Sequence, residues 1–228
     1  VEIPEIDWNF ELPSIELPSF SGGGSGSTGG SGDYEVGRLE FSMSEDEFRS
    51  AVNSAIATGG VVYLTGNVHI GSDLSITSAI TIDGQGKYFI CADFVTLAFQ
   101  NVTFRNCYNK TIKDIEHENS WCGGFGGALQ LGECTATLTN CKFINNKAGL
   151  EGGAIVINNW VEQGTVTITG CTFQQNTVGS IVDGAPHSDC DIEASGQYLT
   201  VVLGGGNSST RTSNIINYSA NATSRGTW

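Results

Sequence analysis

The sequence that decides the fold occurs twice: residues 137–146 read TLTNCKFINN, and residues 167–176 read TITGCTFQQN. A short glycine motif precedes each copy, GGAL at residues 126–129 and GGAI at residues 152–155. The phenylalanines of the two copies lie 30 residues apart, at Phe143 and Phe173. A sequence that repeats at a period of this size is built from one supersecondary unit. We therefore expect successive copies of one structural repeat.

The residue types of each copy predict short β-strands joined at sharp corners. Apolar residues recur at every second or third position, as at Leu138, Cys141 and Phe143, without a helical period. One buried strand face per circuit is typical of a β-solenoid, whose coils stack their inward side chains on one another. Paired glycines suit corners of positive φ or close approach, and stacked asparagines can satisfy corner backbone groups. The residues expected to hold the repeat are Gly126, Gly127, Phe143, Asn146, Gly152, Gly153, Phe173 and Asn176.

The two alternating motifs, GGA[I/L] and FxxN, resemble the paired repeats of the polymorphic membrane protein family, first recognised in chlamydial surface autotransporters. The likeness covers roughly residues 126–176, with weaker echoes back to about residue 60. It implies a right-handed parallel β-helix, of the pectate-lyase-like kind, displayed outside the cell for adhesion or assembly. The resemblance implies no active site and carries over no catalytic residue.

A helix is expected before the β repeat. Ser44 and Glu47 form a capping-box pattern, and Phe48, Val52 and Ala55 follow on one helical face. Such a helix would cap an end of the solenoid, where an exposed sheet edge invites aggregation. We expect an N-terminal cap over residues 33–58, a parallel β-helix over 59–203 with an excursion at 108–125, and a polar tail or cap over 204–228.

The first 32 residues differ in composition from the rest of the chain. Residues 21–32 have the composition of a flexible, engineered Gly/Ser linker. Residues 1–20 are acidic without a basic residue, and Ile6, Trp8, Phe10 and Leu12 alternate with polar residues in strand periodicity. One interpretation is a solubility or crystallisation aid. The other is a binding segment, from a partner or from another copy of the parent protein, tethered to its receptor with Trp8 as anchor.

Composition limits the partners and the compartment. Ten basic against 24 acidic residues give a net charge of −14, which argues against nucleic acid or an anionic membrane surface as partner. No apolar run is long enough to insert directly into a membrane, and no signal peptide is present, which suggests a mature fragment. Seven cysteines fit an oxidising compartment, so we expect an extracellular or cell-surface protein.

The cysteines and the sequons support the same compartment. Cys141 and Cys171 occupy equivalent inward positions, where small buried thiols are favoured over a disulfide although the expected spacing allows one. Some of the remaining cysteines are expected to pair: Cys91, Cys107, Cys122, Cys134 and Cys190. Asn-x-Ser/Thr sequons, some of which arise by chance, begin at Asn101, Asn109, Asn207, Asn217 and Asn221.

Two functions of different classes remain after this reading. The first is a non-catalytic surface module that binds an extended peptide and links subunits head to tail into a filament. The second is a carbohydrate-active enzyme, a polysaccharide lyase or glycoside hydrolase, because this fold hosts many of them. No carboxylate pair recurs in register with a basic neighbour, so we expect no catalytic residue, metal or cofactor. The carboxylates of the central and later repeats are Glu133, Glu151, Asp183, Asp189, Asp191 and Glu193, and the isolated histidines are His69, His117 and His187. A row of exposed aromatics and carboxylates in one groove would favour the enzyme.

Overall fold

The computed structural model describes residues 35–36, 40–112, 123–179, 189–219 and 222–228. This part of the chain is mostly β, with parallel sheets and one helix, α1 (Glu45–Thr58). The strands are β1 (Glu35–Val36), β2 (Val61–Tyr63), β3 (Val68–Ile70), β4 (Leu74–Ile76), β5 (Thr81–Asp83), β6 (Ile90–Asp93), β7 (Thr96–Gln100), β8 (Thr103–Arg105), β9 (Tyr108–Asn109), β10 (Thr111–Ile112), β11 (Leu129–Gly132), β12 (Thr135–Thr139), β13 (Lys142–Ile144), β14 (Lys147–Ala148), β15 (Ile155–Asn158), β16 (Gly164–Thr169), β17 (Thr172–Gln174), β18 (Thr177–Val178), β19 (Ile192–Ser195), β20 (Leu199–Leu203), β21 (Ser208–Ser209), β22 (Ile216–Ser219) and β23 (Thr223–Gly226).

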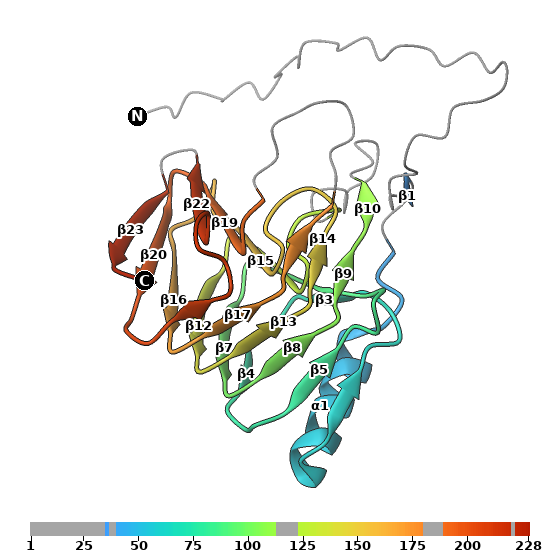
Figure 1. Cartoon of the computed structure of the whole chain (residues 1–228). Helices are drawn as coiled ribbons and strands as arrows, with labels where there is room; N and C mark the ends of the chain where they lie inside the picture. Colours follow the sequence, from blue (N-terminus) through green and yellow to red (C-terminus); the bar gives the residue numbers. More distant parts are fainter. Residues whose placement is uncertain (1–34, 37–39, 113–122, 180–188, 220–221) are drawn as a thin grey trace, which may run out of the picture. The chain divides into compact units, whose positions relative to one another are not determined.

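Three six-stranded parallel sheets make up most of the described structure. Their strand orders are β22-β19-β15-β11-β6-β3, β23-β20-β16-β12-β7-β4 and β2-β5-β8-β13-β17-β21. From β3 onward the chain visits these sheets in a fixed rotation, so each circuit adds one strand to each sheet. Figure 1 shows the consequence in the second sheet, where β4, β7, β12, β16, β20 and β23 lie side by side.

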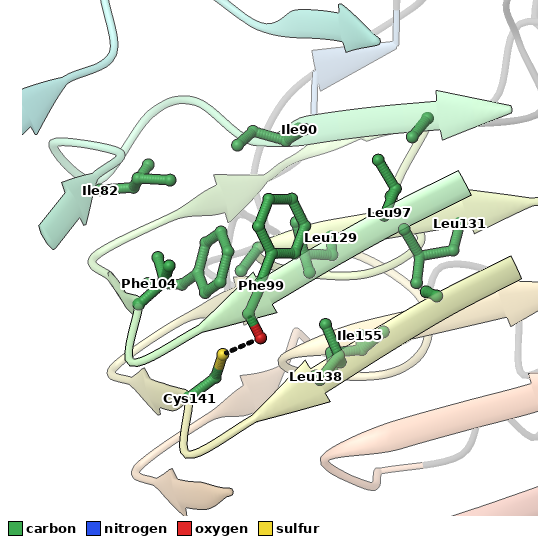
Figure 2. Close-up of a cluster of buried hydrophobic side chains, with 14 of the residues drawn as sticks. Ile82, Ile90, Leu97, Phe99, Phe104, Leu129, Leu131, Leu138, Cys141 and Ile155 are labelled. Atoms are coloured by element: carbon green, nitrogen blue, oxygen red, sulfur yellow. Dashed lines mark hydrogen bonds between the residues drawn. The ribbon is translucent and has the colours of Figure 1, made fainter. Parts of the chain in front are cut away.

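The register in which the parallel strands pair explains why the sequence repeats. Phe143 pairs with Phe104 on one side and with Phe173 on the other. The ring centroids of neighbours are 5.0 Å apart, with interplanar angles of 7° and 8°. Parallel strands one circuit apart keep like positions together, so the inward rows become columns of apolar side chains. Figure 2 shows part of this core, with Phe99, Leu97, Leu129 and Leu138 pointing between the sheets.

Helix α1 forms where the capping box was expected. Ser44 is the N-cap, and the side chains of Ser44 and Glu47 each accept a hydrogen bond from the backbone of the other residue. The helix buries Phe48, Val52 and Ala55 and packs against β2 and β3. It ends at Gly59, whose φ of 64° is the left-handed conformation that glycine adopts without strain.

Residues 204–228 differ from the expected tail or cap because they continue the stack. Strands β21, β22 and β23 each extend one of the three large sheets, so β20 is not the last strand. β21 and β23 contain no apolar side chain, whereas β22 alternates Ile216 and Tyr218 with polar residues. Backbone pairing holds them, and the ring of Trp228 lies 5.4 Å from that of Phe173.

Two smaller sheets lie at the excursion and at the corner after the phenylalanine strands. β1 pairs in parallel with β10, and β14 lies between β9 and β18. Part of the predicted excursion, residues 113–122, lies outside the described residues, as do residues 1–34.

Candidate functional site

The repeat asparagines form a hydrogen-bonded ladder at the corner after β13 and β17. Asn146 Oδ1 accepts a hydrogen bond from the Cys107 N–H at 3.0 Å, and Asn176 Oδ1 accepts one from the Asn146 N–H at 3.1 Å. The side-chain amides donate to the carbonyls of Phe104 at 3.2 Å and Phe143 at 3.0 Å. Both asparagines are buried. Each therefore joins its own circuit to the preceding one and satisfies corner backbone groups.

The repeat glycines lie beside the asparagine ladder, because a Cβ atom on Gly153 would be 3.0 Å from the carbonyl carbon of Asn176. Gly126 and Gly152 have φ values of 71° and 60°, in the left-handed region. Gly127 and Gly153 lie against the next circuit: a Cβ atom on Gly127 would be 2.1 Å from the carbonyl oxygen of Gly153. Any larger residue at position 127 would separate the two circuits. All eight repeat residues thus have structural roles here.

An acidic cluster terminates the asparagine ladder. Asp191 accepts hydrogen bonds from the Asn176 amide at 3.2 Å and the Ser209 hydroxyl at 2.6 Å. Arg211 is 3.4 Å from Asp191 and 2.7 Å from Asp189. Burial raises the pKa of the Asp191 carboxyl above its ordinary value, although these hydrogen bonds and Arg211 oppose that shift. The role of Arg211 could not be predicted from the sequence, because a residue 35 positions after Asn176 gives no local signal.

Glu193, two residues after Asp191, is also buried for a structural purpose. Its carboxylate accepts hydrogen bonds from the Asn217 amide at 2.7 Å and the Ser219 hydroxyl at 2.9 Å, both on β22. Burial raises the pKa of Glu193, and the two hydrogen bonds oppose the shift. Asp191 and Glu193 are 1% and 3% exposed, so a polymeric substrate does not reach them in this structure.

A hollow lined partly by exposed apolar side chains lies at the corner between the first two large sheets. Its volume is about 450 Å³, and it is lined by Asp93, Phe94, Phe125, Gly132, Glu133, Asn158, Trp160 and Val161. Three apolar side chains there are unusually exposed: Phe94 by 59%, Trp160 by 48% and Val161 by 72%. We call this set of lining residues the aromatic corner.

Left-handed backbone conformations and a backbone hydrogen bond determine where the residues of the aromatic corner lie. Phe94 follows β6 and Glu133 follows β11, at equivalent corner positions, and both take left-handed φ values, 53° and 50°. The Phe94 N–H donates to the carbonyl of Gly132, which joins the two circuits at this point. A non-glycine residue in this conformation is strained and persists only where its surroundings hold it.

Glu133 clamps the loop that carries Trp160. Its carboxylate accepts hydrogen bonds from three successive backbone N–H groups, those of Trp160 at 2.7 Å, Val161 at 3.1 Å and Glu162 at 2.9 Å. Asp93 is also engaged, because its carboxylate lies 2.5 Å from the imidazole of His69. The two carboxylates of the aromatic corner therefore already have polar partners within the protein.

Two further hollows lie at the two ends of strands β5, β8 and β13, one where these strands begin and one at the corner that follows them. One, of about 510 Å³, includes Thr81, Thr103 and Lys142 in its lining. The other, of about 490 Å³, includes Tyr108 and Lys147, whose ammonium lies 4.9 Å from the Tyr108 ring centroid. No Asp or Glu is among the described residues that line either hollow.

Five buried cysteines of the described residues hold thiols. Cys107, Cys134, Cys141, Cys171 and Cys190 are not in disulfides. The Cys141 thiol donates to the Phe99 carbonyl of the preceding circuit at 3.3 Å, the contact drawn in Figure 2. Burial raises the pKa of Cys107 to about 12 and that of Cys134 to about 11. The expected pairing stays a prediction for Cys91 and for Cys122, which lies outside the described residues.

Several other expectations meet the limits of the described chain. The peptide anchors Ile6, Trp8, Phe10 and Leu12, the linker, and Asp183, His117 and His187 lie outside it. Among the described residues, no cluster of His, Cys, Asp and Glu has the geometry to hold a metal ion. No helix in that part of the chain is long and apolar enough to cross a membrane. The sequon at Asn109 is buried, its side chain bonded to Gly124 and Phe125.

Comparison with known proteins places the chain in no established family. No family model matches it, and no solved structure matches it. Over 123 residues it is 31% identical to the metabotropic glutamate receptor-like protein R of Dictyostelium discoideum. The match covers 51% of this chain and 7% of that protein. The chain is therefore similar to a small segment of a much longer relative.

Proposed function

We propose that the stacked sheets form a right-handed parallel β-helix, capped by α1, that works as a non-catalytic adhesion or assembly module outside the cell. In this proposal the module binds an extended peptide of the kind that residues 1–20 represent. The motif likeness to polymorphic membrane protein repeats supports the extracellular setting, and the contact of α1 with the first strands supports the cap.

The observation that carries the binding role is the chemistry of the three hollows. Two have no carboxylate among their described lining residues, and in the third Asp93 and Glu133 are engaged by His69 and by backbone N–H groups. A glycosidase needs two available carboxyl groups about 5 to 9.5 Å apart. Aromatic, amide and lysine side chains without such a pair suit the binding of an extended chain better than its cleavage.

An extended peptide uses its main chain and its alternating side chains separately. Added to a sheet edge or laid in a groove, it forms main-chain hydrogen bonds and places every second side chain in a pocket. Ile6, Trp8, Phe10 and Leu12 are such a row. If the segment belongs to the same parent protein, binding between molecules is a heterologous contact, which builds a filament when its rotation does not close.

Calorimetry of residues 1–20 with the rest of the chain tests this function. A protease site placed in residues 21–32 allows the segment to be cleaved and removed after the chain has folded. A synthetic peptide of residues 1–20 should then bind at micromolar concentration, and the Trp8→Ala peptide at least tenfold more weakly, because a large buried aromatic is the commonest hot spot. Absence of binding at high micromolar concentration, or equal binding by both peptides, would refute the proposal. Residues 1–20 would then be interpreted as a solubility or crystallisation tag.

The carbohydrate-active enzyme is kept as the second candidate because the aromatic corner combines exposed rings with carboxylates. The assay is incubation with a panel of acidic and neutral polysaccharides. We expect no chain cleavage. Reproducible cleavage that Asp93→Asn or Glu133→Gln abolishes would establish the enzyme instead.

A further inference from the structure

We propose that Asn101 is an N-glycosylation site, the one sequon of the described residues whose asparagine amide can carry a glycan on the folded chain. This inference goes beyond peptide binding and shares with the proposed function only the extracellular setting. The modification is the transfer of an oligosaccharide from a lipid-linked diphosphate donor by an oligosaccharyltransferase. A bond forms between Asn101 Nδ2 and the anomeric carbon of the first sugar, and the bond from that carbon to the phosphate oxygen breaks. The amide gives up one proton, and the lipid diphosphate leaves with the bonding electron pair.

Asn101 lies at the corner between β7 and β8, where the chain passes from one large sheet to the next. Its φ of 61° is in the left-handed region, where asparagine is enriched among residues other than glycine. The residue is exposed, and within the described chain its side chain has no hydrogen-bond partner. A glycan on Nδ2 therefore displaces no contact that holds the fold.

The three residues of this sequon divide between the core and the surface. Val102 is fully buried, whereas Asn101 and Thr103 both line the hollow of about 510 Å³ where β5, β8 and β13 begin. A sequon needs an asparagine amide and a hydroxyl two residues later, and here both groups are on the same side of the chain. A sugar attached to Asn101 starts in a surface hollow and extends into solvent, which is the placement that a bulky, hydrophilic glycan requires.

Two of the other sequons use their amides inside the fold. Asn109 is fully buried, and its amide donates to the Phe125 carbonyl at 2.7 Å. The Asn207 amide donates to the carbonyls of Ile168 at 3.0 Å and Gly204 at 2.9 Å. A carboxamide has two N–H donors, and a glycosidic bond replaces one of them, so a glycan on Asn207 would remove at least one of these hydrogen bonds.

A third sequon asparagine, Asn217, is partly buried and connects two strands. Its amide donates to the Glu193 carboxylate at 2.7 Å, which joins β22 to β19. A glycan there would compete with a charge-assisted hydrogen bond to a buried carboxylate. The last sequon begins at Asn221, which lies outside the described residues. The hydrogen bonds and burial therefore favour Asn101 over the three other described sequon asparagines.

The repeat supplies a matched control one circuit later. Asn140 occupies the like corner between β12 and β13, with a φ of 51°, and it is exposed and lines the same hollow. Two residues after it stands Lys142, which pairs with Thr103 on the adjacent strand, so this corner has the asparagine without the hydroxyl. The left-handed corner alone thus accounts for an asparagine, and Lys142→Thr converts this corner into a sequon of the same backbone geometry.

The test is secretion of the full chain, behind a cleavable signal peptide, from a eukaryotic host that performs N-glycosylation. Enzymatic release of glycans by peptide:N-glycosidase converts each glycosylated asparagine to aspartate, and peptide mass spectrometry then measures occupancy at each sequon separately. Asn101→Gln removes the acceptor. Thr103→Val removes only the hydroxyl and keeps a β-branched residue on β8, and Thr103→Ser keeps the hydroxyl. Urea unfolding verifies that each secreted variant folds as the parent does.

The variants give both a loss and a gain of the modification. We expect a glycan on Asn101 in most secreted parent molecules, its loss in Asn101→Gln and Thr103→Val, and its retention in Thr103→Ser. Lys142→Thr should carry a second glycan, on Asn140. An unmodified Asn101 in the secreted parent would overturn the site. An occupied Asn101 together with an unmodified Asn140 in Lys142→Thr would overturn the argument from corner geometry.

The sequons with bonded amides test the argument from burial. Asn109, Asn207 and Asn217 should be unmodified in secreted protein that unfolds cooperatively. A glycan on Asn109 in such protein would overturn that argument, because the structure leaves no space for a sugar at that side chain. These results leave the proposed function untouched, because calorimetry of the peptide measures binding independently of the glycan, and failure of that binding would leave the Asn101 site standing.

Discussion

Replacement of Phe143 with Ala should be among the most damaging single changes in this chain. The Phe143 side chain is fully buried and lies between two parallel rings, each 5.0 Å away. Removal of a buried Phe costs about 3 to 5 kcal/mol through lost burial and the cavity left behind. Each stacked ring pair adds about 0.5 to 1.5 kcal/mol. Strands β8, β13 and β17 are fixed by pairing, so the cavity cannot collapse, and we expect a loss of at least about 4 kcal/mol.

The measurement is urea unfolding of Phe143→Ala beside two comparison variants. Phe143→Leu keeps most of the volume and should lose about 1.5 kcal/mol. Lys142→Ala, an exposed position on the same strand, should change the free energy of unfolding by less than about 0.5 kcal/mol. A loss below about 2 kcal/mol for Phe143→Ala would refute the reasoning, because it would mean that the ring column does not bear on stability.

Three further predictions follow from the interior. Asn146→Ala removes the side-chain partners of the Cys107 N–H and the Phe104 carbonyl, so the free energy of unfolding in urea should fall by about 2 to 4 kcal/mol. The exposed control Gln174→Ala should change it little, and equal losses would show that the asparagine ladder does not stabilise the fold. Burial raises the folded-state pKa of Glu193, so its contribution to stability is present below the ordinary pKa and is lost as pH rises through the folded pKa. The free energy of unfolding of the parent relative to Glu193→Gln should therefore fall as the pH rises above the ordinary pKa of glutamate, and a rise would contradict the direction of the pKa shift. Thiol titration in denaturant without reductant should count five groups, those of Cys107, Cys134, Cys141, Cys171 and Cys190, with Cys91 and Cys122 paired; a count of seven would exclude that pair.

The sequence predicted the interior well because the interior is repetitive. Phe143 and Phe173 stand at like positions in two copies of one pattern, and parallel pairing in register turns like positions into neighbours. The capping box could be predicted for a different reason, since Ser44 and Glu47 act within one helical turn. Both signals can be recognised in a single sequence, because one acts within a few residues and the other recurs along the chain.

The aromatic corner could not be predicted, because its geometry depends on contacts across circuits. Glu133 holds Trp160 from 27 residues away, and the left-handed backbone of Phe94 leaves no mark on the residue type. The last circuit was missed for a third reason: β21 and β23 contain no apolar side chain and show no strand periodicity, so they resemble a tail in sequence. One signal was present, however, in the pair of large apolar residues Trp160 and Val161 placed between two strands.

The register of the sheets also determines how this chain can change in length. Lys142 and Thr172 are partners on adjacent strands, so a deletion of residues 142–171 joins Cys141 directly to the next copy of the same corner. Phe104 would then meet Phe173, Leu129 would meet Ile192, and the Cys107 N–H would face Asn176, each pair matched in type. Insertions or losses of one whole circuit preserve every column, whereas a change of one residue reverses the facing of a strand. In the proposed β-helix, gain or loss of sequence should therefore be tolerated best in units of one circuit.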